Sequence, residues 1–403
     1  MRKTVLIAGN FDFPKGNAAG KRVLGLGYIL NSLGYDVVYV GCKRERKSNN
    51  ILDTRKKYEN FIYYSFNGSR NVQDICNVSS TFSDFIEVVN SVRIQNVKMI
   101  VLYGSPVLAL WIRKVIHFCH KSRIPVVFDC VDWIEKSGFD SLIKNIIKLI
   151  DTNYMKRWLA CRCDGVITIS RYLYEYYKNR ECKTVLIPPV GITEFEYKDD
   201  RVIRDKTGEE NAISIVYAGS MPTGHGVNRL KMKDRIDLSI EIMEKLNEKN
   251  IDFVFDIFGI EETQYKTAIP EHVAIIDGLS SKIIFHGQTN NDVVCQYIKE
   301  ADFTILNRIV TKVTTAGFPS KVSESFLLGT PVITNATSNV DEYVINGENG
   351  MIIDFNTDAA ACQIEKLVRE KGNIKFMKES CKKNCKFDYH NFEKSLEDFI
   401  EEL

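Results

Sequence analysis

The stretch of sequence that decides the fold is AGFPSKVSESFLLGTPVITN, residues 316–335. Its first residues predict a loop that leads into a helix beginning near Ser320, and the apolar run at 331–334 predicts a buried strand. A helix that begins beside Gly317 presents free backbone N–H groups, which bind phosphate groups or sugar hydroxyls. The segment therefore indicates the ligand-binding edge of an α/β sheet.

Two charged side chains of this helix suit a nucleotide. Lys321 brings a positive charge to the helix start, and Glu324, one turn further on, is suited to accept hydrogen bonds from two neighbouring ribose hydroxyls. The alternative is a helix start of the capping-box type, with a solvated lysine and glutamate.

Short β-branched runs alternate with helical stretches along both halves of the chain. The expected strands are residues 4–8, 36–40, 99–103, 125–129, 165–169 and 184–187, and then 213–218, 253–258, 283–287, 303–306, 331–334 and 351–353. Helices are expected between them, for example at 234–246 and 290–300. This alternation predicts an α/β fold of two Rossmann-like, doubly wound parallel-sheet domains that face one cleft.

The domain boundaries follow from breaks in this pattern. We expect an N-terminal domain at 1–190, a polar linker at 191–211 and a C-terminal domain at 212–372. Residues 373–403 are expected to form helices that pack across both domains. A chain of 403 residues is long enough for two separate cores.

Composition limits the partners and the compartment. The net charge is +2, which gives no general field for nucleic acid. The chain has eleven cysteines, an odd number, which argues for reduced thiols. The apolar run near residue 5 is too short for a signal segment or a membrane span, so a cytoplasmic protein is expected.

The order of several motifs resembles a known family. FPSK at 318–321, Glu324 and GTPVI at 329–333 resemble the donor-site signature of retaining GT-B glycosyltransferases, specifically family four (glycosyl transferases group 1) of bacterial surface polysaccharide synthesis. The resemblance covers nearly the whole chain, and its other marks are PKGNAAG at 14–20, DCVDW at 129–133, CDGVITISR at 163–171, YAGS at 217–220 and NGENG at 346–350.

The resemblance implies a function, with 1–190 as the acceptor domain and 212–372 as the nucleotide-sugar-binding domain. The protein would transfer a sugar from a nucleoside-diphosphate-sugar to a hydroxyl of a lipid-linked glycan, with retention and without a metal or cofactor. The residues expected to bind the donor are Gly16, Asn17, Gly219, Lys233, Gly317, Phe318, Ser320 and Glu324. For the loop that contains Gly16, a plain turn is the alternative.

Two positions depart from the family's pattern. Ala316 stands where a glutamate is usual, and Ser220 stands where an arginine would hold the diphosphate. We expect Arg308, which ends a buried strand, to act with Lys321 on the leaving diphosphate. Lys233 is a further candidate, and an exposed lysine at a helix start is its alternative.

A carboxylate is also expected near the acceptor. Asp132, close to the strand end at Asp129, is suited to orient or deprotonate the acceptor hydroxyl, although ordinary capping of the strand end is equally consistent. His117 and His120 lack a convincing set of further ligands, so no metal site is predicted.

Other interpretations remain open. The segment 142–158 interleaves apolar and basic residues, which is typical of contact with an anionic membrane surface or of a core-packing helix with exposed lysines. The alternative functions are a nucleotide-sugar epimerase or hydrolase, and an inactive nucleotide-sugar-binding subunit, which Ala316 would favour.

Overall fold

The computed structural model describes residues 2–14, 17–43, 48, 50–67, 77–133, 142–193, 212–222, 224, 227–370 and 373–403. The chain forms two compact units. The N-terminal unit consists of Met1–Gly191, Ala316–Phe318 and Asp388–Leu403, and the C-terminal unit consists of Ile192–Thr315 and Pro319–Phe387.

The described residues of the N-terminal unit form an eight-stranded sheet in the order β3-β4-β2-β1-β5-β6-β7-β8. Neighbouring strands are parallel, except that β3 runs antiparallel to β4. The strands are β1 (Thr4–Gly9), β2 (Asp36–Lys43), β3 (Lys56–Tyr58), β4 (Phe61–Asn67), β5 (Val97–Tyr103), β6 (Val126–Cys130), β7 (Gly165–Thr168) and β8 (Thr184–Leu186).

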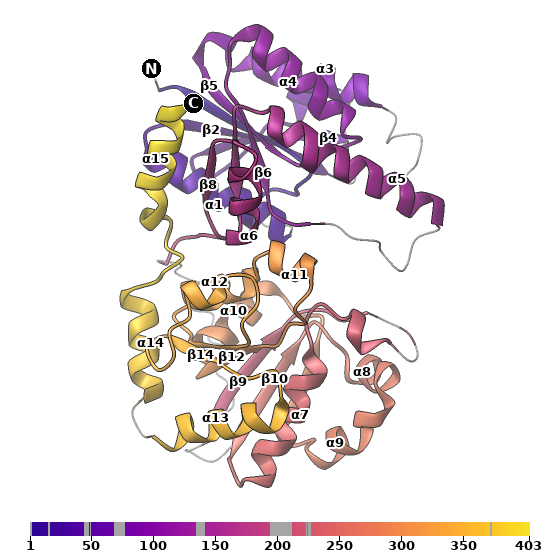
Figure 1. The fold of residues 1–403 in the computed structure, drawn as a ribbon, viewed down its shortest axis with the longest axis vertical. Helices are drawn as coiled ribbons and strands as arrows, with labels where there is room; N and C mark the ends of the chain where they lie inside the picture. The colour runs from indigo at the N-terminus through magenta and orange to yellow at the C-terminus, as the bar shows by residue number, and fades with distance from the viewer. Residues whose placement is uncertain are drawn as a thin grey trace. The chain divides into compact units, whose positions relative to one another are not determined.

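Helices surround this sheet (Figure 1). They are α1 (Ala18–Ser32), α3 (Val78–Ser91), α4 (Leu110–Ser122), α5 (Leu142–Asn153), the π-helical turn η3 (Tyr154–Leu159), α6 (Arg171–Lys178) and α15 (Glu393–Glu402). The central strand β1 is buried along its whole length, as expected for a parallel strand covered on both faces. The last helix, α15, lies against β8 and α1.

The C-terminal unit has a six-stranded parallel sheet in the order β11-β10-β9-β12-β13-β14. Its strands are β9 (Ile213–Ala218), β10 (Phe253–Phe258), β11 (Ile283–Gly287), β12 (Phe303–Leu306), β13 (Val332–Thr334) and β14 (Gly350–Ile352). Its helices are α7 (Ile236–Glu248), α8 (Glu262–Ala268), α9 (Val273–Gly278), α10 (Asn291–Glu300), α11 (Lys312–Ala316), α12 (Ser320–Leu327), α13 (Thr357–Arg369) and α14 (Asn373–Lys383).

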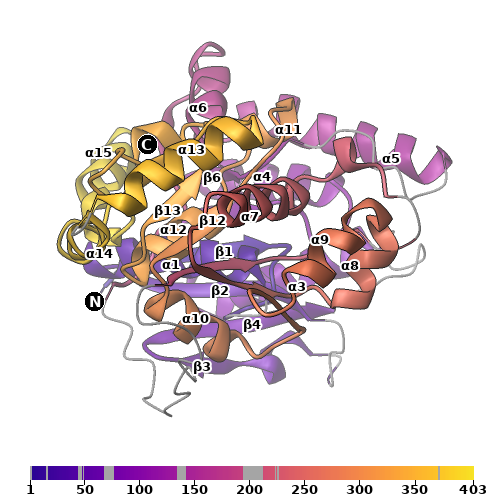
Figure 2. The same ribbon diagram turned by 90° about the horizontal axis from the view of Figure 1, so that it is seen from below.

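The helices of this unit pack as two groups. Helix α7 packs against α13, and α12 packs against β12, β13 and α14 (Figure 2). Single 3₁₀ turns occur at Ile51–Thr54, Ile94–Asn96, Ala160–Arg162, Arg229–Lys231, Pro270–His272, Val340–Glu342 and Tyr389–Phe392.

The predicted fold class, two α/β units built on parallel sheets, is confirmed. Strands β3 and β4 were not predicted. β3 is a short exposed edge strand whose side chains carry no apolar pattern. β4 carries the aromatic run FIYYSF, with Phe61, Tyr64 and Phe66 buried, so its signal was present in the sequence. The C-terminal segment divides between the units, with α14 in the C-terminal unit and α15 in the N-terminal unit. Most of the expected linker, residues 194–211, lies outside the described residues.

One buried ion pair joins the first helix of the N-terminal unit to the centre of its sheet. Arg22 of α1 donates to both carboxylate oxygens of Asp129, at 3.2 and 2.9 Å. Its Nη1 donates to the carbonyls of Ile187 and Pro188, at 2.7 and 2.6 Å. Asp129 therefore anchors the end of β6, which favours the capping interpretation for this residue.

We predict that Asp129→Ala destabilises the protein by about 3–5 kcal/mol, because the substitution leaves the buried guanidinium of Arg22 without its anion. Chemical denaturation of wild type and variant measures the change. The control is Asp36→Ala, at the exposed start of β2, which should alter stability by less than about 0.5 kcal/mol. Equal stability of the two variants would show that the pair does not hold α1 on the sheet.

Candidate functional site

The C-terminal sheet reverses its winding direction between β9 and β12. From β9 the chain continues to β10 on one side, and later β12 pairs with β9 on the other side. The loops after β9 and β12 therefore diverge, and such a point is where open α/β sheets bind ligands. Tyr217 lies at the end of β9, and Asn307 and Arg308 follow β12.

Three glycines allow the turns beyond the strands to pack closely. The Gly219 amide donates to the carbonyl of Phe258 at 3.0 Å, and the Gly259 amide donates to that of Gly287 at 2.7 Å. Gly259 has a φ of +85°, and a Cβ there would lie 2.1 Å from the carbonyl oxygen of Gly219. A side chain at this position would therefore force the two turns apart.

A carboxylate joins two cations at this edge of the sheet. Asp234, just before α7, forms a β-bridge with Arg308. Its Oδ1 accepts from Arg308 Nε at 2.8 Å, and its Oδ2 accepts from Lys321 Nζ at the start of α12. The side chains of Arg308, Asp234 and Lys321 are 5%, 14% and 32% exposed. We call these three residues the charge triad.

Contacts within the charge triad favour the ionised forms of Asp234 and Lys321. Burial alone would raise the pKa of Asp234, but Lys321 and Arg308 outweigh that effect and lower it below its usual value. Burial likewise opposes the charge of Lys321, but Tyr217 and Asp234 raise the pKa of the ammonium. Both groups are therefore ionised near neutral pH.

Lys321 also contacts the end of β9. Its Nζ lies 4.9 Å from the ring centroid of Tyr217. A Cβ on Gly219 would lie 2.4 Å from Lys321 Nζ and 2.5 Å from the Tyr217 oxygen. The absence of a side chain at Gly219 thus leaves room for the lysine to reach the sheet. Burial raises the pKa of Tyr217, so its hydroxyl stays protonated.

A buried donor at this place is unsatisfied. Within the described residues, Arg308 Nη1 has no hydrogen-bond partner. Buried polar groups in native proteins are almost always paired, because an unpaired one costs about 1–3 kcal/mol. An anionic ligand with several oxygens would satisfy this donor.

The backbone at Arg308 is fixed by side chains of neighbouring strands. Its amide donates to Asn335 Oδ1 at 2.7 Å, and Asn335 Nδ2 returns a bond to its carbonyl at 2.9 Å. The Arg235 amide donates to the carbonyl of Asn307 at 2.7 Å, and Asn307 Nδ2 donates to Ser239 Oγ at 2.9 Å. These bonds hold the start of α7 against the end of β12.

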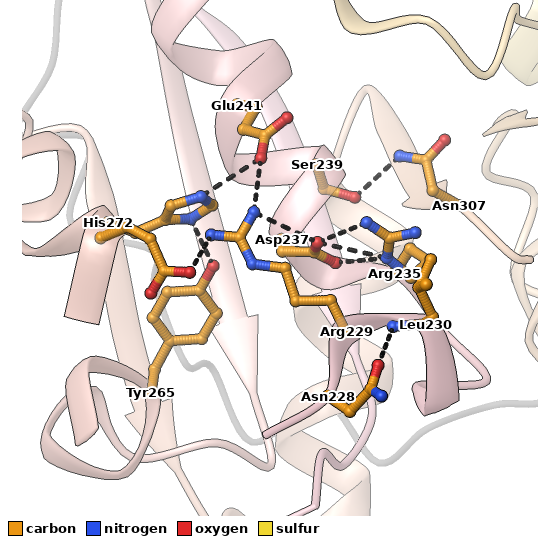
Figure 3. A network of polar contacts seen from close by, with 11 residues as sticks. Asn228, Arg229, Leu230, Arg235, Asp237, Ser239, Glu241, Tyr265, His272 and Asn307 are labelled. Carbon is orange, nitrogen blue, oxygen red and sulfur yellow. Dashed lines mark hydrogen bonds and ion pairs between the residues drawn. The ribbon is translucent and has the colours of Figure 1, made fainter. Parts of the chain in front are cut away.

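A polar network secures the same start of α7 (Figure 3). Arg235 makes a bidentate contact with the fully buried Asp237, through bonds of 2.9 and 2.7 Å. Arg229 contacts Glu241 at 3.2 Å and Glu271 at 2.9 Å. Planar guanidinium groups with paired contacts fix geometry better than a single point charge does.

The network continues through a buried histidine. His272 lies 3.2 Å from Glu241 through its Nε2 and 2.8 Å from the Tyr265 hydroxyl through its Nδ1 (Figure 3). The side chain of His272 lowers the pKa of Glu241 by hydrogen bonding. The segment before α7 is therefore rigidly attached to the body of the unit.

A cavity of about 280 Å³ lies next to the charge triad. Its wall combines glycine backbone, a few polar side chains and an apolar floor. It is lined by Val216, Ala218, Gly219, Phe258, Gly259, Gln288, Thr289, Asn291, Val294, Cys295, Ile298, Thr304, Ile305, Leu306, Ser320, Lys321, Val322, Glu324 and Val332. An apolar pocket with a few convergent polar groups and a charged end is typical of a small-molecule site.

The structure brings several expected site residues together and separates others. Gly219, Ser320, Lys321 and Glu324 line this cavity, and Arg308 meets Lys321 through Asp234. The exposed Lys233 neighbours the triad in sequence and does not line the cavity.

Gly317 and Phe318 are buried and group with the N-terminal unit. In that unit Asn17 is the N-cap of α1, and its side chain accepts from the Gly20 amide at 2.8 Å. Asp132 contacts the buried Lys156, whose Nζ also donates to the Asp132 carbonyl at 2.7 Å. Gly16 lies outside the described residues.

Sequence reasoning missed the residues that connect the site. From the sequence alone, Asp234 predicts only the beginning of a helix, and Tyr217 stands only as part of the YAGS motif. Gln288 and Thr289 follow β11 directly, so the rule that ligands lie beyond strand ends could have identified them. No sequence signal pairs Asn335 with Arg308.

Metal clusters and membrane-spanning helices are both absent from the described part of the chain. No group of three or more His, Cys, Asp or Glu residues within those ranges is arranged to hold a metal ion. Among the described helices, none combines the length and apolar character needed to cross a bilayer.

A protein-family model matches the part of the chain that contains this site. The model of the family described as Glycosyl transferases group 1 matches residues 226–386, which include the whole charge triad and Glu324. No curated protein sequence matches the chain.

Solved structures share the fold of the whole chain. Sucrose-phosphate synthase from Thermosynechococcus elongatus is 13% identical, with a TM-score of 0.66 over 99% of this chain and 98% of that chain. A glycosyltransferase from Rickettsia africae is 15% identical, with a TM-score of 0.66 over 100% and 98%. Anabaena HepE in complex with UDP-glucose is 14% identical, with a TM-score of 0.63 over 100% of both chains.

The lowered pKa of Asp234 makes a testable contribution to stability. A carboxylate whose pKa is lower in the folded protein stabilises it above the unfolded pKa of about 4, and that stabilisation is lost as pH falls through the folded pKa. We therefore expect Asp234→Asn to lower stability by about 1.5–3 kcal/mol at pH 7. The difference from wild type should shrink as the pH falls below about 4.

Scanning calorimetry between pH 7 and pH 3.5 measures this difference. The control is Asp252→Asn, which removes an exposed carboxylate at the amino end of β10 that pairs with Lys282. That variant should differ little from wild type across the range. A difference for Asp234→Asn that grows toward low pH would contradict the charge assignment.

Proposed function

We propose that this chain is a GT-B glycosyltransferase and that it uses a nucleoside-diphosphate-sugar as donor. Its residues 226–386 match the glycosyl transferases group 1 family, and its fold is similar to that of solved glycosyltransferases. The acceptor would be a hydroxyl of a lipid-linked surface glycan. The observation that carries the proposal is the cavity at the reversal point of the sheet, with two cations at its edge. HepE, which has a similar fold, was solved with UDP and with UDP-glucose.

The lining of the cavity suits the parts of such a donor. Its apolar floor and the amides near Gln288 would take the base, and Glu324 would accept hydrogen bonds from the ribose hydroxyls. Lys321 and Arg308, with the Tyr217 hydroxyl, would then face the diphosphate, aided by the backbone amides at the start of α12.

The proposed chemistry needs no strong protein nucleophile. As the glycosidic bond breaks, negative charge grows on the leaving diphosphate, and fixed positive charges stabilise that transition state. We propose that Lys321 and Arg308 act in this way without a metal ion, and that the configuration at the anomeric carbon is retained. Asp132, whose side chain is 47% exposed, would orient the acceptor hydroxyl.

Two rival functions differ in their products. An epimerase or a hydrolase would turn over the donor without an acceptor. An inactive subunit, which Ala316 would favour, would bind a donor and release nothing. The same assay can therefore separate all three functions.

A screen of UDP-, GDP- and TDP-sugars by thermal shift should identify a donor that raises the melting temperature, because ligand binding stabilises the native state. With this donor and a glycan acceptor, we expect transfer that persists in EDTA. Glu324→Ala should weaken donor binding by about tenfold to a hundredfold, the loss of a charged hydrogen bond.

The control for this variant is Glu248→Ala, an exposed glutamate at the end of α7 that pairs with Lys245. It should bind the donor like wild type. Turnover without acceptor would favour the hydrolase, and binding without turnover would favour the inactive subunit. Unchanged donor affinity in Glu324→Ala would exclude the ribose assignment.

We further propose that the protein works at the cytoplasmic face of a membrane that holds the acceptor. Helix α5 and the turn η3 expose Ile146, Ile147, Ile150 and Trp158, at 46%, 54%, 64% and 63%. Lys148 is exposed on the same helix. Apolar side chains beside a basic one match an anionic lipid surface.

This membrane proposal predicts sedimentation of the protein with phosphatidylglycerol vesicles and much weaker sedimentation with phosphatidylcholine vesicles. Ile150→Glu should reduce the bound fraction several-fold, because it places a charge in the apolar face. Phe376→Glu on α14 changes an equally exposed apolar residue elsewhere and serves as the control. Binding that is insensitive to Ile150→Glu would remove α5 from the membrane contact.

A further inference from the structure

Asp234 contacts the two cations that the proposed function assigns to the diphosphate. Its two oxygens accept from Arg308 Nε and from Lys321 Nζ, as two oxygens of a diphosphate would. A carboxylate in this position is unfavourable for binding an anion, because like charges repel. Its presence therefore calls for a role other than ligand binding.

The charge balance of the triad shows what the carboxylate changes. Two positive charges and one negative charge leave a single net positive charge at the edge of the cavity. Without Asp234, two cations would repel each other at a half-buried place, and the flexible side chain of Lys321 would have no fixed partner there. The carboxylate thus lowers the net positive charge that attracts an anion, and in return it fixes the positions of the two cations.

The carboxylate is itself held in place by its neighbours. Its backbone pairs with that of Arg308, and the next residue, Arg235, is fixed by Asp237 and by the Asn307 carbonyl. The position of Asp234 is thus set by the sheet and by α7, not by the ligand. An anchor with such support can orient both cations before the donor arrives.

The triad still has capacity for a ligand. Arg308 Nη1 is buried beside it and makes no hydrogen bond within the described part of the chain. Asp234 therefore accepts from Nε of Arg308 and leaves Nη1 for another acceptor. Phosphate oxygens could bind the remaining donors while the carboxylate keeps its own contacts.

Resting on the proposed function, we infer that Asp234 is a positioning residue for the departure of the diphosphate. It weakens binding of the diphosphate in the ground state and holds Lys321 and Arg308 where charge grows in the transition state. Affinity and turnover should therefore respond in opposite directions when the carboxylate is neutralised.

The test compares wild type with Asp234→Asn. Binding of inorganic pyrophosphate and of UDP is measured by calorimetry at low and high salt, and turnover is measured with the nucleotide sugar that wild type uses. We expect the Kd for pyrophosphate to fall by about tenfold at low salt, since one repelling charge is removed. We expect kcat to fall by about tenfold to a hundredfold, because the cations lose their orientation.

Two further variants complete the experiment. Asp252→Asn removes one carboxylate from the opposite edge of the sheet and should leave both quantities unchanged. Asp234→Glu keeps the charge and alters the reach, so the Kd should stay near that of wild type while kcat falls. This variant also decides the matter if Asp234→Asn does not fold: a kcat equal to that of wild type would then overturn the proposal.

The remaining outcomes are distinct. A parallel loss of affinity and turnover in Asp234→Asn would make Asp234 a merely structural residue, and unchanged values for both would give it no role; either result overturns the inference. Failure of wild type to bind any nucleoside diphosphate would instead refute the proposed function. The two failures are therefore separable.

Discussion

The backbone bridge between Asp234 and Arg308 is the constraint on which the C-terminal unit's site depends. It joins the segments that follow β9 and β12, which leave the sheet in different directions. The bridge and the backbone bond from Arg235 to Asn307 together hold the start of α7 at the end of β12, where the carboxylate and the guanidinium meet. Asn335 bonds to the backbone of Arg308, and the side chain of Asn307 bonds to Ser239 of α7, so several residues of the surrounding sequence stabilise this one junction.

The fold class could be predicted from the sequence, and several residues that line the cavity are among those expected at the site. Strand periodicity is a local property, so the twelve expected strands could be located from β-branched runs alone. The exposed edge strand β3 carries no such pattern, because no burial selects its side chains, whereas the run FIYYSF of β4 was overlooked. Glycines, helix starts and strand ends are also local signals, which is why Gly219, Ser320 and Lys321 could be named in advance.

The rest of the site could not be predicted, because it depends on pairing between distant segments. Asp234 lies 74 residues from Arg308 and 87 from Lys321 along the chain. Before a helix, an aspartate usually indicates only favourable capping. Its contact with two cations follows from the strand order, and no short segment of sequence specifies the strand order. The same holds for Arg22 and Asp129 in the N-terminal unit.

The charges of the triad are carried by residues at the ends of regular elements. Arg308 follows the end of β12, Asp234 precedes α7, and Lys321 lies in the first turn of α12. Buried hydrogen bonds hold the ends of these elements, among them those of Arg235 to Asp237 and of Asn335 to the carbonyl of Arg308. Charges on positions with such support keep their geometry, which is what a site for an anionic ligand requires.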